Sequence, residues 1–375
     1  MLEAIRDGAP ISRAEISRRA GISKPTVSLA LQSLLESELV REVAPDPGRP
    51  SYGALFFEPV PEAALVLGLD LGARFLRGAI CDLHGAVRTR QDVELAGADA
   101  DQALEAIVAL CDSLATATGL PDELVDSAVI GVPGVVDAAT GRVALTSVPG
   151  LEHASFAAAV ERQLGLPVSV DNDINLAALG EQWQGVARGV DDFVFLSVGT
   201  GLGAGLVLHG ELHRGRNGAA GELDLVSAGL GHDIDPCAAA LSTVAGRLAA
   251  GRHGSTLTPP YDPRAIFSAA RAGDELALEI VAEEARRIAL HIVPIAAVAD
   301  VELVVLGGGV GANGDLLLQP VRDLIEAWVP YPPRVEMSTL GEAAVLTGAL
   351  AVARRSALDN VFVNRSTARS GALEA

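Results

Sequence analysis

The segment SRAEISRRAGISKPTVSLALQSLLE, residues 12–36, decides the fold of the first part of the chain. Its apolar residues recur at helical spacing in two short runs, which predicts two amphipathic helices. Gly21 falls between the runs, where a tight turn needs a residue that adopts positive φ without strain. Ser23 is a favourable N-cap for the second helix, and Pro25 lies in its first turn, where no N–H is needed. The pattern predicts a helix-turn-helix.

The second helix is expected to present short polar or basic side chains that suit base edges and phosphates in a DNA major groove. The candidate DNA-binding residues there are Ser23, Lys24, Pro25, Thr26, Ser28 and Gln32. Residues 39–57 follow as a predicted β-hairpin with a tip rich in Pro and Gly. Arg49, between Gly48 and Pro50, is expected to enter an adjacent minor groove. Residues 1–60 are therefore predicted to be a winged helix-turn-helix, with a small helical bundle or a protein-interaction module as the alternative.

The net charge of the chain is −20, which at first disfavours nucleic acid as a partner. The charge is unevenly spread, because residues 1–60 carry seven basic and eight acidic side chains, a net of −1, and the other 315 residues carry −19. A DNA-binding head needs only one basic face, while an acidic body repels phosphate and orients the approach. The total charge therefore does not exclude DNA.

The cysteine content and the apolar runs indicate the compartment. The three cysteines, Cys81, Cys111 and Cys237, form no CxxC pair, which is not a disulfide framework and fits a reducing environment. Residues 1–7 contain no apolar signal core. No apolar run approaches the ~20 residues that span a bilayer. We expect a cytoplasmic protein without a membrane partner.

The body of the chain contains three buried strands that end in glycine-rich turns. They are ALVLGLDLG at 64–72, FVFLSVGTGLGAG at 193–205 and VVLGGGV at 304–310. Such glycines let backbone N–H groups approach a phosphate, although each turn taken alone is weak evidence. Asp70 and Gly72, with Asp82 twelve residues after Asp70, resemble the first phosphate motif of actin-like ATPases.

Five further segments occur in the order found in one family. They are GVPGVVD at 131–137, VDNDINLAALGE at 170–181, SVGTGLG at 197–203, GAAGE at 218–222 and LGGG at 306–309. The chain resembles the ROK family (repressors, open reading frames and kinases), and its first 60 residues match the repressor branch. The resemblance implies an α/β fold for residues 61–358: an actin-like, sugar-kinase-like body of two lobes with a ligand cleft. Residues 359–375 are small and polar and are expected to be a disordered tail.

The resemblance also implies a sugar site. In ROK sugar kinases the Asn and Asp of the NDxN motif hold sugar hydroxyls, and the Asp is the catalytic base; Asn172 and Asp173 occupy those positions, and Glu222 matches the Glu of a second motif. A carboxylate there is suited to accept the proton of an attacking hydroxyl. The alternative interpretation is that Asn172 and its neighbours only cap the helix that starts near Ile174. The two roles are compatible.

Three departures from the kinase pattern disfavour catalysis. The first phosphate turn continues Gly72-Ala73-Arg74 without the usual second glycine and hydroxyl. Leu225 stands where the family has a histidine that binds sugar and zinc. The zinc cluster CxCGxxGC is missing, and His232 and Cys237 alone are too few ligands for a structural site. We expect no metal, no cofactor and no catalytic residue.

We therefore predict a DNA-binding transcriptional repressor that responds to a sugar or sugar-derived effector. One helix-turn-helix binds a half-site, so a homodimer or a tetramer on a palindromic double-stranded operator is expected. An ATP-dependent sugar kinase and a ligand-independent DNA-binding regulator remain the alternatives.

Overall fold

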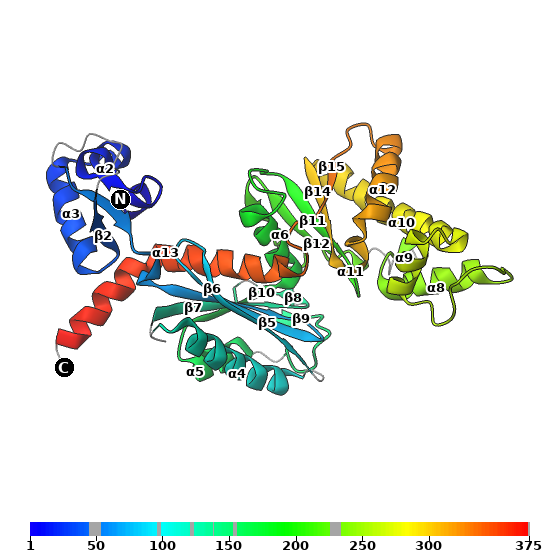
Figure 1. Cartoon of the computed structure of the whole chain (residues 1–375), viewed down its shortest axis with the longest axis horizontal. Coiled ribbons are helices and arrows are strands. Elements are labelled where there is room, and N and C mark those ends of the chain that lie inside the picture. Colours follow the sequence, from blue (N-terminus) through cyan, green and yellow to red (C-terminus); the bar gives the residue numbers. More distant parts are fainter. Residues whose placement is uncertain are drawn as a thin grey trace.

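The computed structural model describes residues 1–44, 54–95, 99–120, 124–137, 139–152, 156–225 and 234–373. Three parts follow one another along the long axis: a small head that contains the N-terminus, a first lobe, and a second lobe at the far end (Figure 1). Helix α13 (Ala344–Leu373) runs back from between the lobes toward the head. Within the described ranges, no helix is both long and apolar enough to cross a membrane.

The head is the predicted winged helix-turn-helix. Its elements are α1 (Leu2–Arg6), β1 (Ile11–Ser12), α2 (Arg13–Ala20), α3 (Lys24–Glu36), β2 (Val40–Val43) and β3 (Phe56–Pro59). The strands form one antiparallel sheet in the order β1-β3-β2. Gly21 ends α2 at φ +67, as the turn requires. Ile16, Val27, Leu31 and Phe57 are buried between the helices and the sheet.

The first lobe is a five-stranded sheet with helices on both faces. Its strands are β4 (Leu65–Leu71), β5 (Phe75–Asp82), β6 (Val87–Glu94), β7 (Val125–Val132) and β10 (Val168–Asn172), in the order β10-β7-β4-β5-β6. Helices α4 (Ala100–Thr118) and α5 (Phe156–Leu164) cover one face, and α13 covers the other (Figure 1). A short hairpin of β8 (Val135–Val136) and β9 (Val143–Ala144) follows β7.

The second lobe has the same plan. Its strands are β11 (Phe193–Val198), β12 (Leu202–Leu208), β13 (Glu211–Leu212), β14 (Leu303–Gly307) and β15 (Arg334–Met337), in the order β13-β12-β11-β14-β15. Its helices are α6 (Asp173–Gln184), α8 (Ala238–Ala249), α9 (Pro263–Arg271), α10 (Glu275–Ala299), α11 (Gly308–Gly311) and α12 (Gly314–Trp328). Val194 and Leu196 pack toward α10 and α12, whereas Phe193 and Phe195 pack toward α6, as strand alternation requires.

Helices α6 and α13 cross with their main chains in direct contact. A Cβ atom on Gly348 of α13 would lie 1.7 Å from the carbonyl oxygen of Leu176, and one on Gly180 of α6 would lie 2.3 Å from the carbonyl oxygen of Ala344. Only glycine permits this approach. The two helices therefore form one unit that joins both lobes.

Helix α13 continues through the segment that the sequence predicts to be a disordered tail, residues 359–375, as far as Leu373. Val361 is only 1% exposed and belongs to the same apolar cluster as Ile5 and Leu39 of the head. This burial stabilises a turn of helix that the composition of the segment does not favour. The apolar core is thus continuous from the head into the first lobe.

Candidate nucleic-acid interface and ligand site

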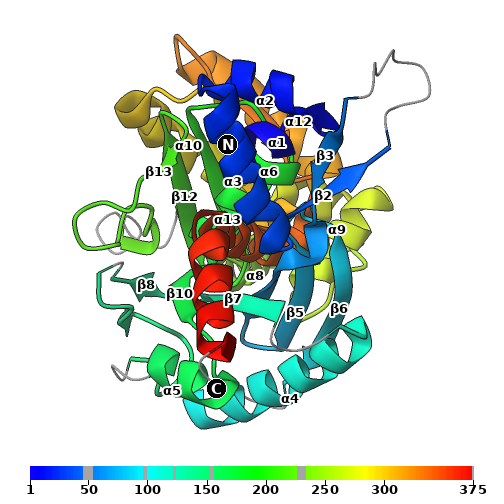
Figure 2. The same cartoon turned by 90° about the vertical axis from the view of Figure 1, so that its left-hand side faces the viewer.

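The exposed side of α3 is the candidate nucleic-acid interface. The helix lies along the outer edge of the head, at the end of the molecule farthest from the second lobe (Figures 1 and 2). Lys24, Pro25, Thr26 and Gln32 are exposed, while Val27, Leu31 and Leu34 on the opposite side are buried. The helix therefore presents a mostly polar face outward while its apolar stripe holds it to the head.

Two of the predicted residues shape the start of α3. Ser23 is the N-cap: its Oγ accepts a hydrogen bond from the Thr26 N–H at 3.4 Å and lies 2.8 Å from the Thr26 Oγ1. Ser28 is half-buried, and its hydroxyl donates to the carbonyl oxygen of Lys24 at 3.1 Å. The hydroxyls of Ser23 and Ser28 are thus already bonded to residues of α3. Lys24, the first residue of α3, has an exposed side chain.

Gln32 makes one side-chain contact within α3. Its amide Nε2 donates to the Glu36 Oε1 at 2.9 Å, which leaves its amide oxygen and one N–H directed away from that contact. Arg49, predicted to enter a minor groove, lies outside the described residues. In α2, both Arg18 and Arg19 bond the Glu15 carboxylate and lower its pKa to about 2, so their positive charges are partly neutralised.

One apolar residue that the sequence pattern did not assign to this interface lies on it. Leu29 is 70% exposed on the outer face of α3, although a leucine in an amphipathic helix is ordinarily assigned to the core. Its helical angle gives the only sequence signal: it lies four residues after Pro25 and three before Gln32.

The candidate ligand cluster lies where β10 ends and α6 begins. Asn172 is buried and caps α6: its Oδ1 accepts from the Asn175 N–H at 2.9 Å, and its Nδ2 donates to the Gly134 carbonyl oxygen at 2.8 Å. The capping interpretation therefore holds for Asn172, and both ends of its amide are engaged. Asp173 is the first residue of α6 and accepts a hydrogen bond from the Ile174 N–H.

Two other carboxyl groups act on Asp173 in this cluster. Loss of solvation, together with the charges of Asp70 and Glu222, raises the pKa of Asp173 to about 7. Burial likewise raises the pKa of Asp70 to about 6, against the opposing charge of Arg77. Burial, and then the charge of Asp224, raises the pKa of Glu222. The fold thus brings Asp173 within electrostatic range of Asp70, at the end of β4, and of Glu222.

Two arginines that sequence reasoning missed are paired with acids of this cluster. The Arg77 Nη1 donates to the Asp70 Oδ2 at 3.2 Å, and the Arg214 Nη2 donates to the Asp171 Oδ2 at 2.5 Å. The second pair joins β10 of the first lobe to the segment that follows β13 of the second lobe. A local sequence pattern cannot predict this contact, because Arg214 and Asp171 are 43 positions apart.

The glycine-rich turns meet only in part. A Cβ atom on Gly199, in the second turn, would lie 3.4 Å from the backbone nitrogen of Gly309 in the third. In the first turn the Gly72 N–H donates to the Phe75 carbonyl oxygen at 2.9 Å, and Arg74 is paired with Glu94. Asp82 faces Leu65 across the sheet, at the opposite end of the strand pair from Asp70.

The region that corresponds to the family's zinc cluster has other partners. Leu225 is 62% exposed, and His232 lies outside the described residues. The Cys237 thiol donates to the Asp235 Oδ2 at 3.1 Å, and burial raises its pKa to about 11. In the part of the chain that the structure describes, no group of three His, Cys, Asp or Glu side chains is arranged to hold a metal ion.

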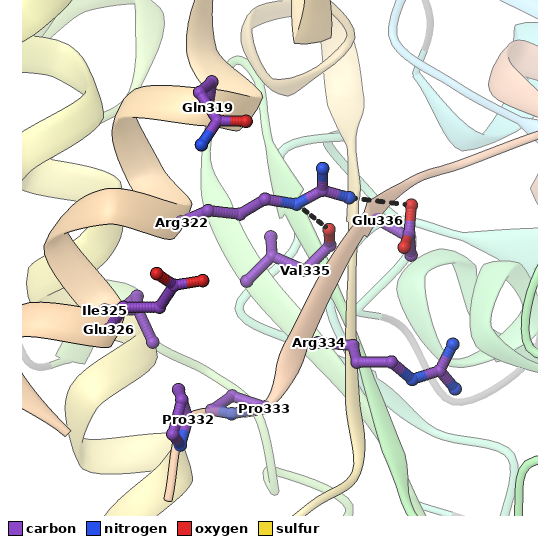
Figure 3. A pocket seen from close by; sticks show the side chains of 9 residues that line it. All are labelled: Gln319, Arg322, Ile325, Glu326, Pro332, Pro333, Arg334, Val335 and Glu336. Carbon is purple, nitrogen blue, oxygen red and sulfur yellow. Dashed lines mark hydrogen bonds and ion pairs between the residues drawn. The ribbon is translucent and has the colours of Figure 1, made fainter. Parts of the chain in front are cut away.

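A hollow of about 450 Å³ lies between α12 and β15 (Figure 3). Arg322 crosses it, with its Nε donating to the Val335 carbonyl oxygen at 2.8 Å and its Nη2 3.0 Å from the Glu336 Oε2. None of the predicted site residues lines this hollow. Arg322 is thus already satisfied by the protein, and Arg334, the second arginine of the lining, is paired with Glu302.

Two family models match the chain. The ROK family model matches residues 66–356, and the MarR family model matches residues 1–50. Among curated relatives, the xylose repressor of Caldicellulosiruptor bescii is 26% identical over 374 residues, which cover 94% of each chain. The glucokinase of Halalkalibacterium halodurans is 33% identical over 244 residues, 58% of this chain and 73% of the enzyme.

Solved structures show the same architecture. A ROK family transcriptional regulator described as a homolog of the E. coli MLC protein superposes with a TM-score of 0.78 at 23% identity, over 97% of this chain and 96% of the other. A ROK family glucokinase from Streptomyces griseus, in complex with glucose and AMPPNP, superposes with a TM-score of 0.66 at 28% identity. That match covers 78% of this chain and all of the kinase, and the ROK family model likewise begins only at residue 66, after the head.

Proposed function

The chain belongs to the ROK family, and we propose that it is a DNA-binding transcriptional repressor whose kinase-like body senses a small polyhydroxy molecule. The observation that carries this proposal is the polar outer face of α3, on a head that precedes the part of the chain matched by the ROK family model. The match of residues 1–50 to the MarR family supports it, as do the names of the xylose repressors that align with nearly the whole chain.

In this proposal α3 enters the major groove. Ser23, Lys24, Pro25 and Thr26 form the end of the helix nearest the sugar-phosphate backbone, and Lys24 neutralises a phosphate. Ser28 and Gln32 approach the base edges, and the amide of Gln32 is suited to adenine. Arg49 enters the adjacent minor groove. Two copies of the chain bind the two halves of a palindromic operator.

The effector binds at the start of α6. Asp173 and Glu222 supply two carboxyl groups, which suit the hydroxyls of a sugar. Asn172 supplies the second N–H of its amide, since the rest of the amide is bonded to Asn175 and Gly134. The names of the relatives, xylose repressor and glucokinase, favour a monosaccharide. The Arg214–Asp171 pair stands beside this cluster and joins the two lobes, so an effector that disturbs it also changes how the lobes are held together.

The signal passes along α6 and α13. These helices touch through Gly180 and Gly348, and α13 reaches the head, where Val361 is buried beside residues of α1. A shift of the first turn of α6 therefore moves α13 and changes the spacing of the paired heads. Because binding free energies are reciprocal, the effector weakens operator binding by the same factor by which the operator weakens effector binding.

A selection from random duplexes with the full chain, followed by titration at several salt concentrations, tests the DNA-binding half. We expect a two-fold symmetric site whose affinity falls steeply with salt. Gln32→Ala weakens binding to it. Gln319→Ala is the matched control, because Gln319 donates to Asp323 in the same (i, i+4) arrangement on a remote surface. Failure to enrich any duplex contradicts the proposal.

Isothermal titration with sugars, sugar phosphates and nucleotides tests the sensing half. We expect one class of sugar to bind, to release the operator about tenfold more easily, and to lose affinity in Asp173→Asn. Silence across the panel, with operator binding intact, instead supports a ligand-independent regulator. A reporter gene placed behind the selected operator distinguishes repression from activation.

An ATP-dependent sugar kinase is the second candidate, favoured by one observation. The pKa of Asp173 is raised to about 7, which is suited to a general base at neutral pH. The engaged Arg74 and the exposed Leu225 argue against it, since kinase relatives of the family place other residues there. A coupled assay for ADP release with hexoses decides: turnover that Asp173→Asn abolishes supports the kinase.

A further inference from the structure

Leu29 has no structural role in the head. Its side chain is 70% exposed, and it belongs to none of the apolar clusters that the described residues form. In the described residues of α2 and α3 it is the only large apolar side chain left in solvent. The core positions of α3 are already filled by Val27, Leu31 and Leu34, so the helix is held without it.

The surroundings of Leu29 leave its side chain prominent. Pro25 lies one turn before it and Gln32 one turn after it, on the same face of the helix. The flanking residues Ser28 and Ser33 are small, and their hydroxyls donate back to carbonyl oxygens of α3 at 3.1 and 3.4 Å. Gln32 is drawn toward Glu36. Leu29 is therefore the apolar centre of an otherwise polar outer face.

We propose that Leu29 contacts the 5-methyl group of a thymine and is a specificity-determining residue of the DNA interface. This inference rests on the proposed DNA-binding function and makes it more specific. In the major groove the thymine methyl is the one apolar group larger than a hydrogen atom that a base pair presents. Apart from the C5–H of cytosine, the other positions carry hydrogen-bond donors or acceptors. Leucine has neither, so over a guanine or an unmethylated cytosine it removes water from polar atoms without replacing the lost bonds.

Replacing thymine by deoxyuracil in the selected operator tests the contact, because deoxyuracil lacks only the methyl group. We expect one thymine in each half-site at which this replacement weakens binding by the full-length wild type about fourfold, the value for one buried methyl-sized group. Leu29→Ala weakens binding to the thymine operator by at least the same factor. It binds the thymine and deoxyuracil operators equally at that position.

Three controls make the result specific. Leu29→Met keeps an apolar side chain of similar volume and retains the preference for thymine over deoxyuracil. Ser33→Ala, at the neighbouring exposed position, also retains it. Thermal unfolding of Leu29→Ala matches the wild type, because the side chain contributes no core packing.

The outcomes separate this inference from the function on which it rests. If no duplex is bound, the proposed DNA-binding function fails. If a site is bound but no thymine position loses its methyl dependence in Leu29→Ala, the head binds DNA and the role given to Leu29 is wrong. Loss of methyl dependence at one symmetric pair of positions, with the rest of the scan unchanged, establishes it.

Discussion

The guanidinium of Arg354 lies over the indole ring of Trp183, with its Cζ atom 5.7 Å from the ring centroid. The Arg354 Nε also donates to the Leu83 carbonyl oxygen at 2.6 Å. Arg354 therefore joins α13 to the far end of α6 and to the turn after β5. Burial lowers the pKa of Arg354, and the positive charge of Arg6 in the head adds to that effect. The head, the last turn of α6 and the middle part of α13 meet at this arginine.

Arg354→Ala removes the cation–π contact and the hydrogen bond to Leu83. We expect the free energy of unfolding to fall by about 1–2 kcal/mol, measured by urea unfolding of the full chain. Arg355→Ala, at the neighbouring exposed position, is the control and leaves stability unchanged. An equal free energy of unfolding for the two variants would show that the contacts of Arg354 do not stabilise the fold.

Gly348→Ala places a methyl group into the main chain of α6. Because that Cβ atom would lie 1.7 Å from the Leu176 carbonyl oxygen, the helices must separate. We expect a loss of about 3 kcal/mol or more in the free energy of unfolding. Gly309→Ala is the comparison, since a Cβ atom there meets nothing within 4 Å. A Gly348→Ala protein as stable as Gly309→Ala contradicts the direct contact.

Asp173 makes stability depend on pH. Its pKa rises on folding from 3.8 to about 7, so the folded state binds more protons than the unfolded state between these values. The stabilising effect of its proton is therefore complete below about pH 4 and is lost as pH rises to about 7, with a slope of at most about 1.4 kcal/mol per pH unit. Urea unfolding of Asp173→Asn across this range should show a flatter profile than the wild type. The exposed Asp112→Asn should reproduce the wild-type slope.

Arg49→Ala is expected to weaken operator binding and to reduce the slope of log affinity against log salt by about one, because one phosphate-proximal charge is lost. Fluorescence anisotropy at increasing salt measures both quantities. Arg41→Ala serves as the comparison, since Arg41 is already paired with Glu58. An unchanged slope for Arg49→Ala would remove the wing from the interface.

The head was predictable because its determinants are local. Gly21, Ser23 and Pro25 fix a turn, a cap and a place in the first helical turn within five residues, and the structure has all three there. The helix start at Asn172 followed from the same kind of signal. In the structure Asn172 makes the capping bond with Asn175 and lies next to Asp173 in the candidate ligand cluster.

The rest depends on contacts between distant residues. The pairing of Arg214 with Asp171 and the packing of Val361 against the head are set by the tertiary fold. The position of Asp82 shows the same limit: in an antiparallel pair, residues after Arg77 run back toward the start of β4, so Asp82 moves away from Asp70. The spacing of twelve residues between Asp70 and Asp82 does not by itself show that the second strand reverses direction. The outward side of Leu29 likewise follows from how α3 is seated, not from its apolar character.

The contact between Gly180 and Gly348 has a mechanical consequence. Where side chains separate two helices, changes of rotamer can accommodate small movements of one helix without moving the other. The backbones of α6 and α13 touch, so no side chains lie between them at this point to adjust in that way. A small tilt of α6 must therefore also tilt α13. Because α13 is the longer helix, its far end moves through a greater distance than the contact point does. In the proposed mechanism a small displacement beside Asn172 would therefore become a larger one at Val361, farther along α13.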